Sequence, residues 1–255
     1  MVELKTDESI DEMRATGRVV AQALAAVRES ARVGVALLDL DRVARDVLRE
    51  AGATSPFLGY RPKFAPVPFP AVICTSVNDA IVHGIPGTYR LRDGDLVSVD
   101  CGAVLGGWAG DAAVSFTVGR PRPADLRLIA TAEAALAAGI AAAVPGNRIG
   151  DIAHAVGTVC RAAGYGIPDG FGGHGVGRHM HEDPGVPNEG PPGRGMKLRP
   201  GMVLAIEPML TAGGTDDYSC DGDGWTLRTV DGSRAAHAEH TVAITADGPR
   251  ILTAP

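Results

Sequence analysis

Three histidines are concentrated in one glycine-rich segment of the chain. The segment FGGHGVGRHMHEDPGVP spans residues 171–187 and holds His174, His179 and His181, out of seven histidines in 255 residues. Its glycines and prolines are incompatible with a long helix, so these imidazoles are expected on strands or loops. Imidazole is a common metal ligand, yet a solvated polar loop has the same composition. The segment alone leaves both interpretations open.

Four carboxylates elsewhere lie at the ends of apolar runs. Asp100 closes LVSVD, Asp111 opens DAAVSF, Glu207 closes MVLAIE and Glu239 opens EHTVAI. Taken alone, each of these carboxylates could be a solvated surface acid or a turn residue, but a glutamate that ends a buried apolar run is costly unless it is paired. Glu207 is the clearest case, because the run before it is wholly apolar and Pro208 follows it.

Helical periodicity predicts the elements that position these residues. The first helix is expected to be capped by Thr6 and to bury a face that runs from Ile10 to Val27. Three more helices are expected: one carrying the apolar positions 40–51 and ending at Gly52, an alanine-rich one from Pro123 to about Val144, and one carrying 152–163 and ending at Gly164.

The chain also contains an internal repeat. The apolar positions of the second and fourth helices match after a shift of 112 residues, as from Leu40 to Ile152. LRDGDLVSVD (91–100) matches LRPGMVLAIE (198–207), and DAAVSF (111–116) matches EHTVAI (239–244). Self-similarity in the same order predicts a duplicated architecture.

The repeat brings the carboxylates together. Asp100 and Asp111 flank a short glycine-rich connection that suits an antiparallel pair of strands, and Glu207 and Glu239 form the equivalent pair in the second half. Four clustered carboxylates disfavour each other's ionisation, which two divalent cations would relieve. With one imidazole from the 171–187 segment, this oxygen-rich set suits manganese, iron, cobalt or zinc. Two such ions can share a nucleophilic hydroxide, so the sequence predicts metal-assisted hydrolysis.

Composition and charge exclude several classes of protein. The net charge is −6, with 30 acidic and 24 basic residues, which argues against a nucleic-acid binder with a basic face. No apolar run reaches the roughly 18 residues of a membrane span, and MVELKTDESIDEMR at the start is not a signal peptide. The four cysteines, Cys74, Cys101, Cys160 and Cys220, lack CxxC spacing and are expected to be reduced thiols of a cytoplasmic protein.

These residues resemble those of type I methionine aminopeptidases, which are metallopeptidases with the pita-bread fold. The resemblance covers nearly the whole chain and rests on SVNDAIVHGIP (76–86), LVSVDCG (96–102), GDAAVSF (110–116), GGHGVGRHMHEDP (172–184), IEPM (206–209), DGWTLRT (223–229) and AEHTV (238–242). It implies one α+β catalytic domain over residues 1–255. The two pseudo-two-fold related halves, roughly 1–120 and 121–255, would share an antiparallel sheet with the helices outside.

The resemblance implies a role for each matching residue. The dinuclear metal centre would be held by Asp100, Asp111, His174, Glu207 and Glu239. Glu207 would also help to activate the bridging water. His83 and His181 would contact the scissile peptide and stabilise charge that develops on its oxygen or nitrogen. His179 matches no functional position.

By the same resemblance, the substrate pocket would take a methionine side chain. Its wall would include Tyr60, Phe69, Cys74, His83, Met180, His181 and Trp225. Apolar, aromatic and sulfur groups suit a thioether. The chain departs from the family where Met180 replaces a common aromatic residue, where Phe69 replaces a common tyrosine, and in the longer loop at 61–70.

The implied activity is removal of the initiator methionine from new peptides whose second residue is small. The enzyme would be a cytoplasmic monomer that acts on a peptide or nascent-chain N-terminus, in keeping with transient association with the ribosome. The alternatives are a proline-specific aminopeptidase or dipeptidase on the same fold, a non-catalytic binding module, and a paralogue with a narrowed substrate range. Proline-specific relatives usually carry a large extra N-terminal domain, and non-catalytic ones typically lose metal ligands.

Three further histidines are given no catalytic or metal-binding role. His154 falls off the apolar face of its helix and is expected to be solvated. His240, beside Glu239, is expected to support the site or to be structural, and His237 is expected in a loop.

Overall fold

The helices of the computed structural model follow the predicted pattern. The structure describes residues 2–63 and 65–254, so Phe64 in the loop at 61–70 lies outside the described residues. The helices are α1 (Asp7–Ser30), α2 (Leu37–Glu50), α3 (Pro123–Ala142) and α4 (Ile149–Ala162). The Thr6 hydroxyl caps α1 by accepting a 3.2 Å hydrogen bond from the backbone N–H of Ser9, as predicted.

A curled antiparallel sheet forms the second layer. Its strands follow the order β1 (Ile73–Val77), β3 (Leu96–Leu105), β4 (Trp108–Thr117), β12 (Glu239–Thr245), β7 (Val203–Ile206), β5 (Gly172–Gly175) and β6 (Glu182–Pro187), with β13 (Gly248–Ile251) paired to β12. Two smaller sheets contain β2 (Ala80–Val82), β10 (Leu227–Thr229) and β9 (Tyr218–Cys220), and β11 (Ala235–His237) with β8 (Met209–Thr211).

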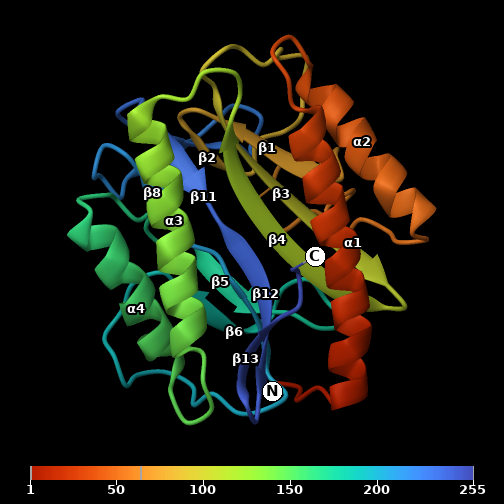
Figure 1. Ribbon diagram of the computed structural model, residues 1–255, viewed down its shortest axis with the longest axis vertical. Helices are drawn as coiled ribbons and strands as arrows, with labels where there is room; N and C mark the ends of the chain where they lie inside the picture. The colour runs from red at the N-terminus through yellow and green to blue at the C-terminus, as the bar shows by residue number, and fades with distance from the viewer. Residues whose placement is uncertain (1, 64, 255) are drawn as a thin grey trace.

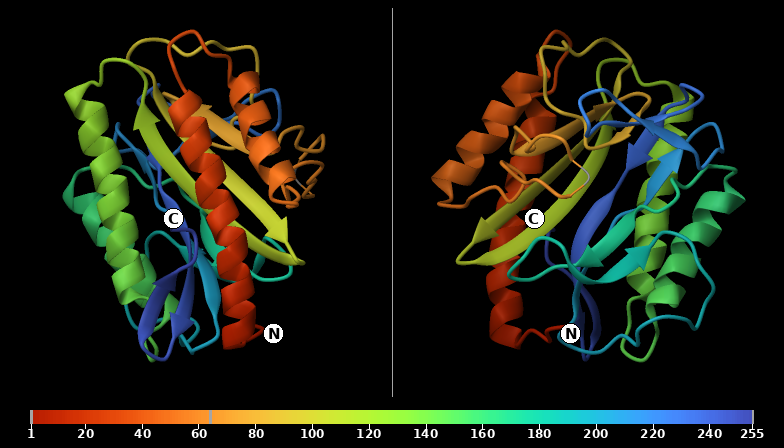
Figure 2. Two further views of the ribbon diagram at one scale, coloured as in Figure 1. Left: turned by 45° about the vertical axis from the view of Figure 1, so that its right-hand side comes forward. Right: turned by 180° about the vertical axis from the view of Figure 1, so that it is seen from behind.

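The four helices cover one face of the large sheet. In Figure 1 the pair α1 and α2 lies over one end of the sheet and the pair α3 and α4 over the other. The right-hand view of Figure 2, from behind, shows that no helix covers the strands on the opposite face. The two helix pairs bury separate apolar cores, one centred on Leu40 and Val97 and the other on Ile152 and Leu204. This arrangement confirms the predicted α+β class with helices outside an antiparallel sheet.

Close backbone packing ties α1 to the end of the chain. A Cβ atom at Gly17 would lie 2.2 Å from the carbonyl oxygen of Leu252, so a larger residue would force the helix away from this segment. Within the described residues, no helix is both long enough and apolar enough to cross a membrane.

Candidate metal centre

The five predicted metal ligands come from five consecutive strand positions in the large sheet. The sheet order β3, β4, β12, β7, β5 supplies them as Asp100, Asp111, Glu239, Glu207 and His174, with Glu207 directly after the last residue of β7. Neighbouring strands lie about 4.8 Å apart, so side chains on one face of adjacent strands meet. The topology therefore gathers residues that are up to 139 positions apart in the chain.

The register of the central strands aligns three of the carboxylates. Asp100 on β3 and Glu239 on β12 are both paired with Ala113 of β4, from opposite sides. Asp111 lies two residues before Ala113 and so points to the same face. The hydroxyl of Thr241 fixes the backbone of Asp111, accepting from its N–H at 2.9 Å and donating to its carbonyl oxygen at 2.7 Å.

Glu207 and His174 complete the group from the other end of the sheet. Ile206 pairs with His240, which sets Glu207 beside Glu239. The Nδ1 atom of His174 lies 2.9 Å from the carbonyl oxygen of Gly175, and its Nε2 atom lies 3.6 Å from Oε1 of Glu207. A backbone carbonyl on one ring nitrogen leaves the other as a lone-pair donor, which is the usual arrangement of a metal-binding histidine.

Gly173 allows the backbone of β5 to pack closely against β7. A Cβ atom at residue 173 would lie 2.0 Å from the carbonyl oxygen of Ala205 on β7. Only glycine therefore allows the backbone beside His174 to reach the neighbouring strand.

The four carboxylates of the cluster raise one another's pKa values because they are buried close together. Burial, and then the charge of Glu207, raise the pKa of Asp100 to about 8. Burial is also the main cause that raises the pKa of Asp111, Glu207 and Glu239 well above their usual values, followed in each case by a neighbouring carboxylate. Without cations the folded protein therefore holds protons on this cluster near neutral pH.

The unpaired atoms of the cluster fit divalent cations. Asp100 Oδ1, Asp111 Oδ1 and Glu239 Oε1 are buried and have no hydrogen-bond partner within the described part of the chain. Ligand atoms of Asp111, His174 and Glu239 lie within 4.8 Å of one another. Buried oxygens without donors are costly, and a cation removes that cost. The residues present therefore fit a metal centre with oxygen ligands and one imidazole.

This charge pattern predicts a pH-dependent stabilisation by metal. Because the carboxyl pKa values are raised on folding, the folded metal-free protein holds more protons than the unfolded chain between about pH 4 and the pKa of Asp100 at about 8. Raising the pH through this window lowers its free energy of unfolding, and bound cations reverse that loss. We expect cobalt(II) to raise the melting temperature by at least about 3 °C more at pH 8.5 than at pH 6. Calorimetry of the metal-free and the cobalt-bound protein at both pH values measures this difference. A cobalt-induced rise in melting temperature that is equal or smaller at pH 8.5 contradicts the prediction.

The structure corrects the prediction for His237. This residue is not in a loop: it ends β11, and its side chain is 2% exposed. Its Nε2 atom lies 3.5 Å from Oε2 of Glu207 and 4.0 Å from Oε2 of Glu239. In the extended sequence HAE, residues two apart point to the same side, so His237 and Glu239 could have been linked from the sequence. Burial lowers the pKa of His237 to about 3.

An apolar cavity of about 240 Å³ opens onto the carboxylates. Of the predicted wall residues, Tyr60, Phe69, Cys74, His83, His181 and Trp225 line it, together with Phe57, Phe171, Gly172 and Met209, which the sequence did not single out. The Trp225 ring packs edge-on against Phe69 at 5.1 Å between centroids, and its Nε1–H donates to the carbonyl oxygen of Val67 at 2.9 Å. Burial raises the pKa of the Cys74 thiol, so this residue presents a neutral wall group.

Met180 packs behind the cavity wall. It does not itself line the cavity, and it is buried in the same apolar cluster as the wall residues Phe57 and Phe69. A Cβ atom at Gly102 would lie 2.4 Å from Cε of Met180 and 2.8 Å from Cε1 of Phe57. Met180 therefore fills the space beside Gly102, and Phe57 contributes to the cavity wall instead.

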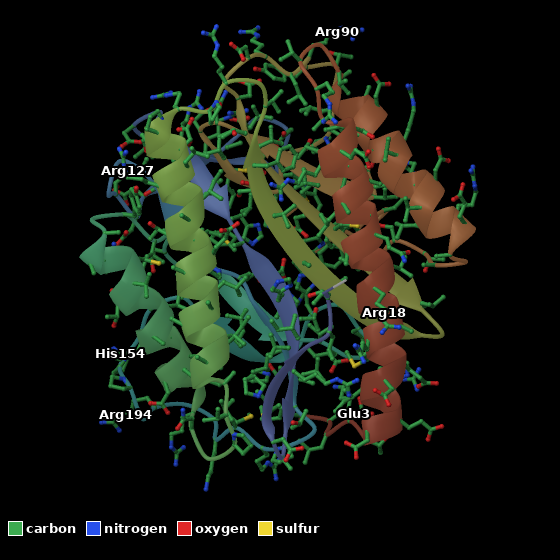
Figure 3. All side chains as sticks on the ribbon, viewed as in Figure 1. Glu3, Arg18, Arg90, Arg127, His154 and Arg194 are labelled. Carbon is green, nitrogen blue, oxygen red and sulfur yellow. The ribbon has the colours of Figure 1, made fainter. Side chains whose placement is uncertain are left out.

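The remaining histidines separate into site and surface residues. The His181 ring lies 4.4 Å from that of His174 and stacks on Tyr60 at 5.4 Å, between centroids. His179 is exposed, and its backbone N–H donates to Glu182. His240 pairs through Nδ1 with the Thr253 hydroxyl at 2.9 Å. His154 is exposed, and Figure 3 shows it on the outer side of α4.

Fold and site together define a metal-dependent hydrolase whose candidate metal ligands lie beside an apolar cavity. The sequence pattern of metallopeptidase family M24 matches residues 11–246, and the chain belongs to this family. Its relatives include methionine aminopeptidase 1 of Mycobacterium tuberculosis, 56% identical over 251 residues that cover 96% of this chain and 92% of the relative. The methionine aminopeptidase of Clostridium acetobutylicum is 45% identical and covers 99% of both chains.

Solved structures agree with this assignment. The crystal structure of methionine aminopeptidase from Thermotoga maritima superposes with a TM-score of 0.95, at 39% identity and over 100% of both chains. Prolidase from Pyrococcus furiosus matches at a TM-score of 0.78 and 22% identity, over 99% of this chain and 65% of its own, which shows a shared fold alone. The fold is thus the pita-bread fold that the sequence motifs predicted.

Proposed function

We propose that this chain is a methionine aminopeptidase that removes the initiator methionine from peptides with a small second residue. The observation that carries the proposal is that four carboxylates and an imidazole lie at a largely apolar cavity of about 240 Å³. A cavity of this kind holds one side chain and leaves its peptide bond beside the polar cluster. The names of the relatives support the same activity.

Two divalent ions, of manganese, iron, cobalt or zinc, would be held by the five predicted ligands. These are Asp100, Asp111, His174, Glu207 and Glu239. When bound, such ions act as Lewis acids and make water nucleophilic near neutral pH. Glu207, whose backbone carbonyl accepts a 3.0 Å hydrogen bond from the Asn188 amide, would accept the proton of the attacking water.

Two histidines would act on the peptide. His83 and His181 both line the cavity, and burial lowers the pKa of each, to about 4 for His83. Both are therefore neutral at pH 7 and can donate one hydrogen bond without carrying charge. His83 is held at a φ of 60°, in the left-handed region that costs free energy for a non-glycine residue. Such strain at a site residue is consistent with a fixed donor position.

The aromatic wall would recognise the methionine side chain. Tyr60, Phe69 and Trp225 surround the cavity with Cys74 and Met209. A thioether gains favourable contacts with aromatic ring edges and needs no hydrogen-bond partner. A branched or charged first residue would lose these contacts.

Peptide hydrolysis tests the proposal directly. Metal-stripped protein with cobalt(II) restored should release methionine from Met-Ala-Ser, and should be at least about 100-fold slower on Met-Leu-Ser and Leu-Ala-Ser. Omitting the metal is the matched control. Preferential cleavage of Ala-Pro-Ser would assign the proline-specific activity instead. Binding of the ions without cleavage of any of these peptides would identify a binding module or a narrowed paralogue.

The role of His181 predicts a separation of catalysis from metal binding. His181→Ala should lower kcat/KM for Met-Ala-Ser by about 100-fold, because a donor to the developing charge is lost. Cobalt affinity, measured by isothermal titration calorimetry, should change by less than about threefold, well below the 10–100-fold or so that loss of a residue orienting a ligand typically costs. Loss of metal before loss of activity would make His181 a ligand. His179→Ala, at an exposed neighbour, is the control.

The cellular setting follows from the same proposal. The four cysteines are unpaired in the structure, which supports a reducing cytoplasmic location. The enzyme would act as a monomer on nascent chains, with transient association at the ribosome. Light scattering tests the monomeric state, and co-sedimentation with ribosomes tests the transient association.

A further inference from the structure

We infer that His237 is a sixth metal ligand, which gives each of the two metal positions its own imidazole. This inference rests on the metal centre proposed above and extends it by a residue outside the predicted ligand set. The observation behind it is a second donor group in the site. Ligand atoms of Glu207, His237 and Glu239 lie within 4.8 Å of one another, as do those of Asp111, His174 and Glu239.

The two donor groups have the same composition. Each contains one imidazole and two carboxylates, and Glu239 is common to both. Glu239 would therefore contribute to both metal positions, and each position would have an imidazole and a second carboxylate of its own. His174 on β5 and His237 on β11 reach the shared Glu239 from different sheets.

The distances at His237 fit a ligand better than a hydrogen bond. Two ligand atoms about 2.1 Å from a tetrahedral ion are about 3.4 Å apart, and Nε2 of His237 lies 3.5 Å from Glu207 and 4.0 Å from Glu239. An N–H to carboxylate hydrogen bond is typically about 2.8 Å long. Within the described residues, Nε2 of His237 is buried and has no hydrogen-bond partner.

The backbone of His237 is held firmly in this position. The Ser115 hydroxyl accepts from the His237 N–H at 3.0 Å and donates to its carbonyl oxygen at 2.7 Å. His237 also pairs with Met209 of β8, a residue of the cavity wall. Such support positions a ligand before the metal arrives.

A second imidazole should change the preference among metals. Imidazole favours zinc, cobalt and iron, whereas a site of carboxylates alone favours manganese and magnesium. The consequence is a centre that prefers borderline metals at both positions.

Cobalt(II) binding to metal-stripped protein tests the inference without any measurement of activity. Each cobalt-bound imidazole gives a strongly shifted exchangeable N–H signal in the proton NMR spectrum. The wild type should show two such signals and bind two ions, and His237→Gln should lose one signal. The affinity for one of the two ions should fall by more than about 100-fold, beyond the range that loss of a residue orienting a ligand causes, and the ratio of zinc to manganese affinity should fall by at least about tenfold.

The glutamine variant distinguishes a metal ligand from a residue that only positions Glu207. Its side-chain amide can still donate a hydrogen bond to Glu207, but it lacks the imidazole nitrogen that would bind a metal. Unchanged spectra and affinities in His237→Gln would overturn the inference and leave the five-ligand centre intact. A wild type that binds no cobalt would overturn the metal centre itself, and this inference with it. His154→Gln, at the exposed histidine of α4, should retain both signals and both affinities.

Discussion

Glu239→Gln is expected to remove metal binding and activity together. Glu239 belongs to both donor groups, so its loss affects both metal positions. Glutamine has nearly the same shape and lacks the charge that a cation requires. We expect cobalt-dependent hydrolysis of Met-Ala-Ser to fall by at least about 1,000-fold, which corresponds to about 4 kcal/mol of transition-state stabilisation. The metal-induced rise in melting temperature should also be lost.

The same substitution should leave the metal-free protein at least as stable as the wild type. The side chain of Glu239 is 2% exposed, and burial and three neighbouring carboxylates raise its pKa. Folding without metal requires this buried acid to be protonated, and a neutral amide removes the free-energy cost of that protonation. Calorimetry of both metal-free proteins measures this, with the exposed Glu133→Gln on α3 as control. A metal-free variant that melts well below the wild type would mean that Glu239 is structural.

Glu207→Gln is expected to abolish turnover by a different route. The donor group of Asp111, His174 and Glu239 does not include Glu207, so at least one ion should still bind. Without a base for the water proton, kcat should fall by about 1,000-fold. Substrate binding should persist, because the cavity wall of Tyr60, Phe69 and Trp225 is unchanged.

Steady-state kinetics and metal stoichiometry distinguish the two glutamate variants. In Glu207→Gln we expect a KM within about threefold of the wild type, so the loss lies in kcat and marks a group that acts in the transition state. Glu133→Gln again provides a control at an exposed position. Near-wild-type turnover of Glu207→Gln would show that another residue accepts the proton.

Much of the fold follows from short-range patterns. The apolar periodicity from Ile10 to Val27 predicts α1 because one helical face must be buried, and the cap at Thr6 and the glycines at 52 and 164 mark helix ends. The carboxylates could be identified because a charge beside a buried strand is costly without a partner. Their position at matching points of a repeat predicted that they meet. The domain division at about residue 120 and the individual catalytic roles stay predictions.

The sequence by itself thus determined the elements, the charged strand ends and the metal chemistry they require, since these depend on local periodicity and on the cost of burying charge. The tertiary structure decided which side chains share a space, because that depends on strand order and register between distant segments. It placed His237 beside Glu207 and Glu239 and put Phe57 and Met209 on the cavity wall. It also placed Met180 against Gly102, where the absence of a side chain leaves room for it.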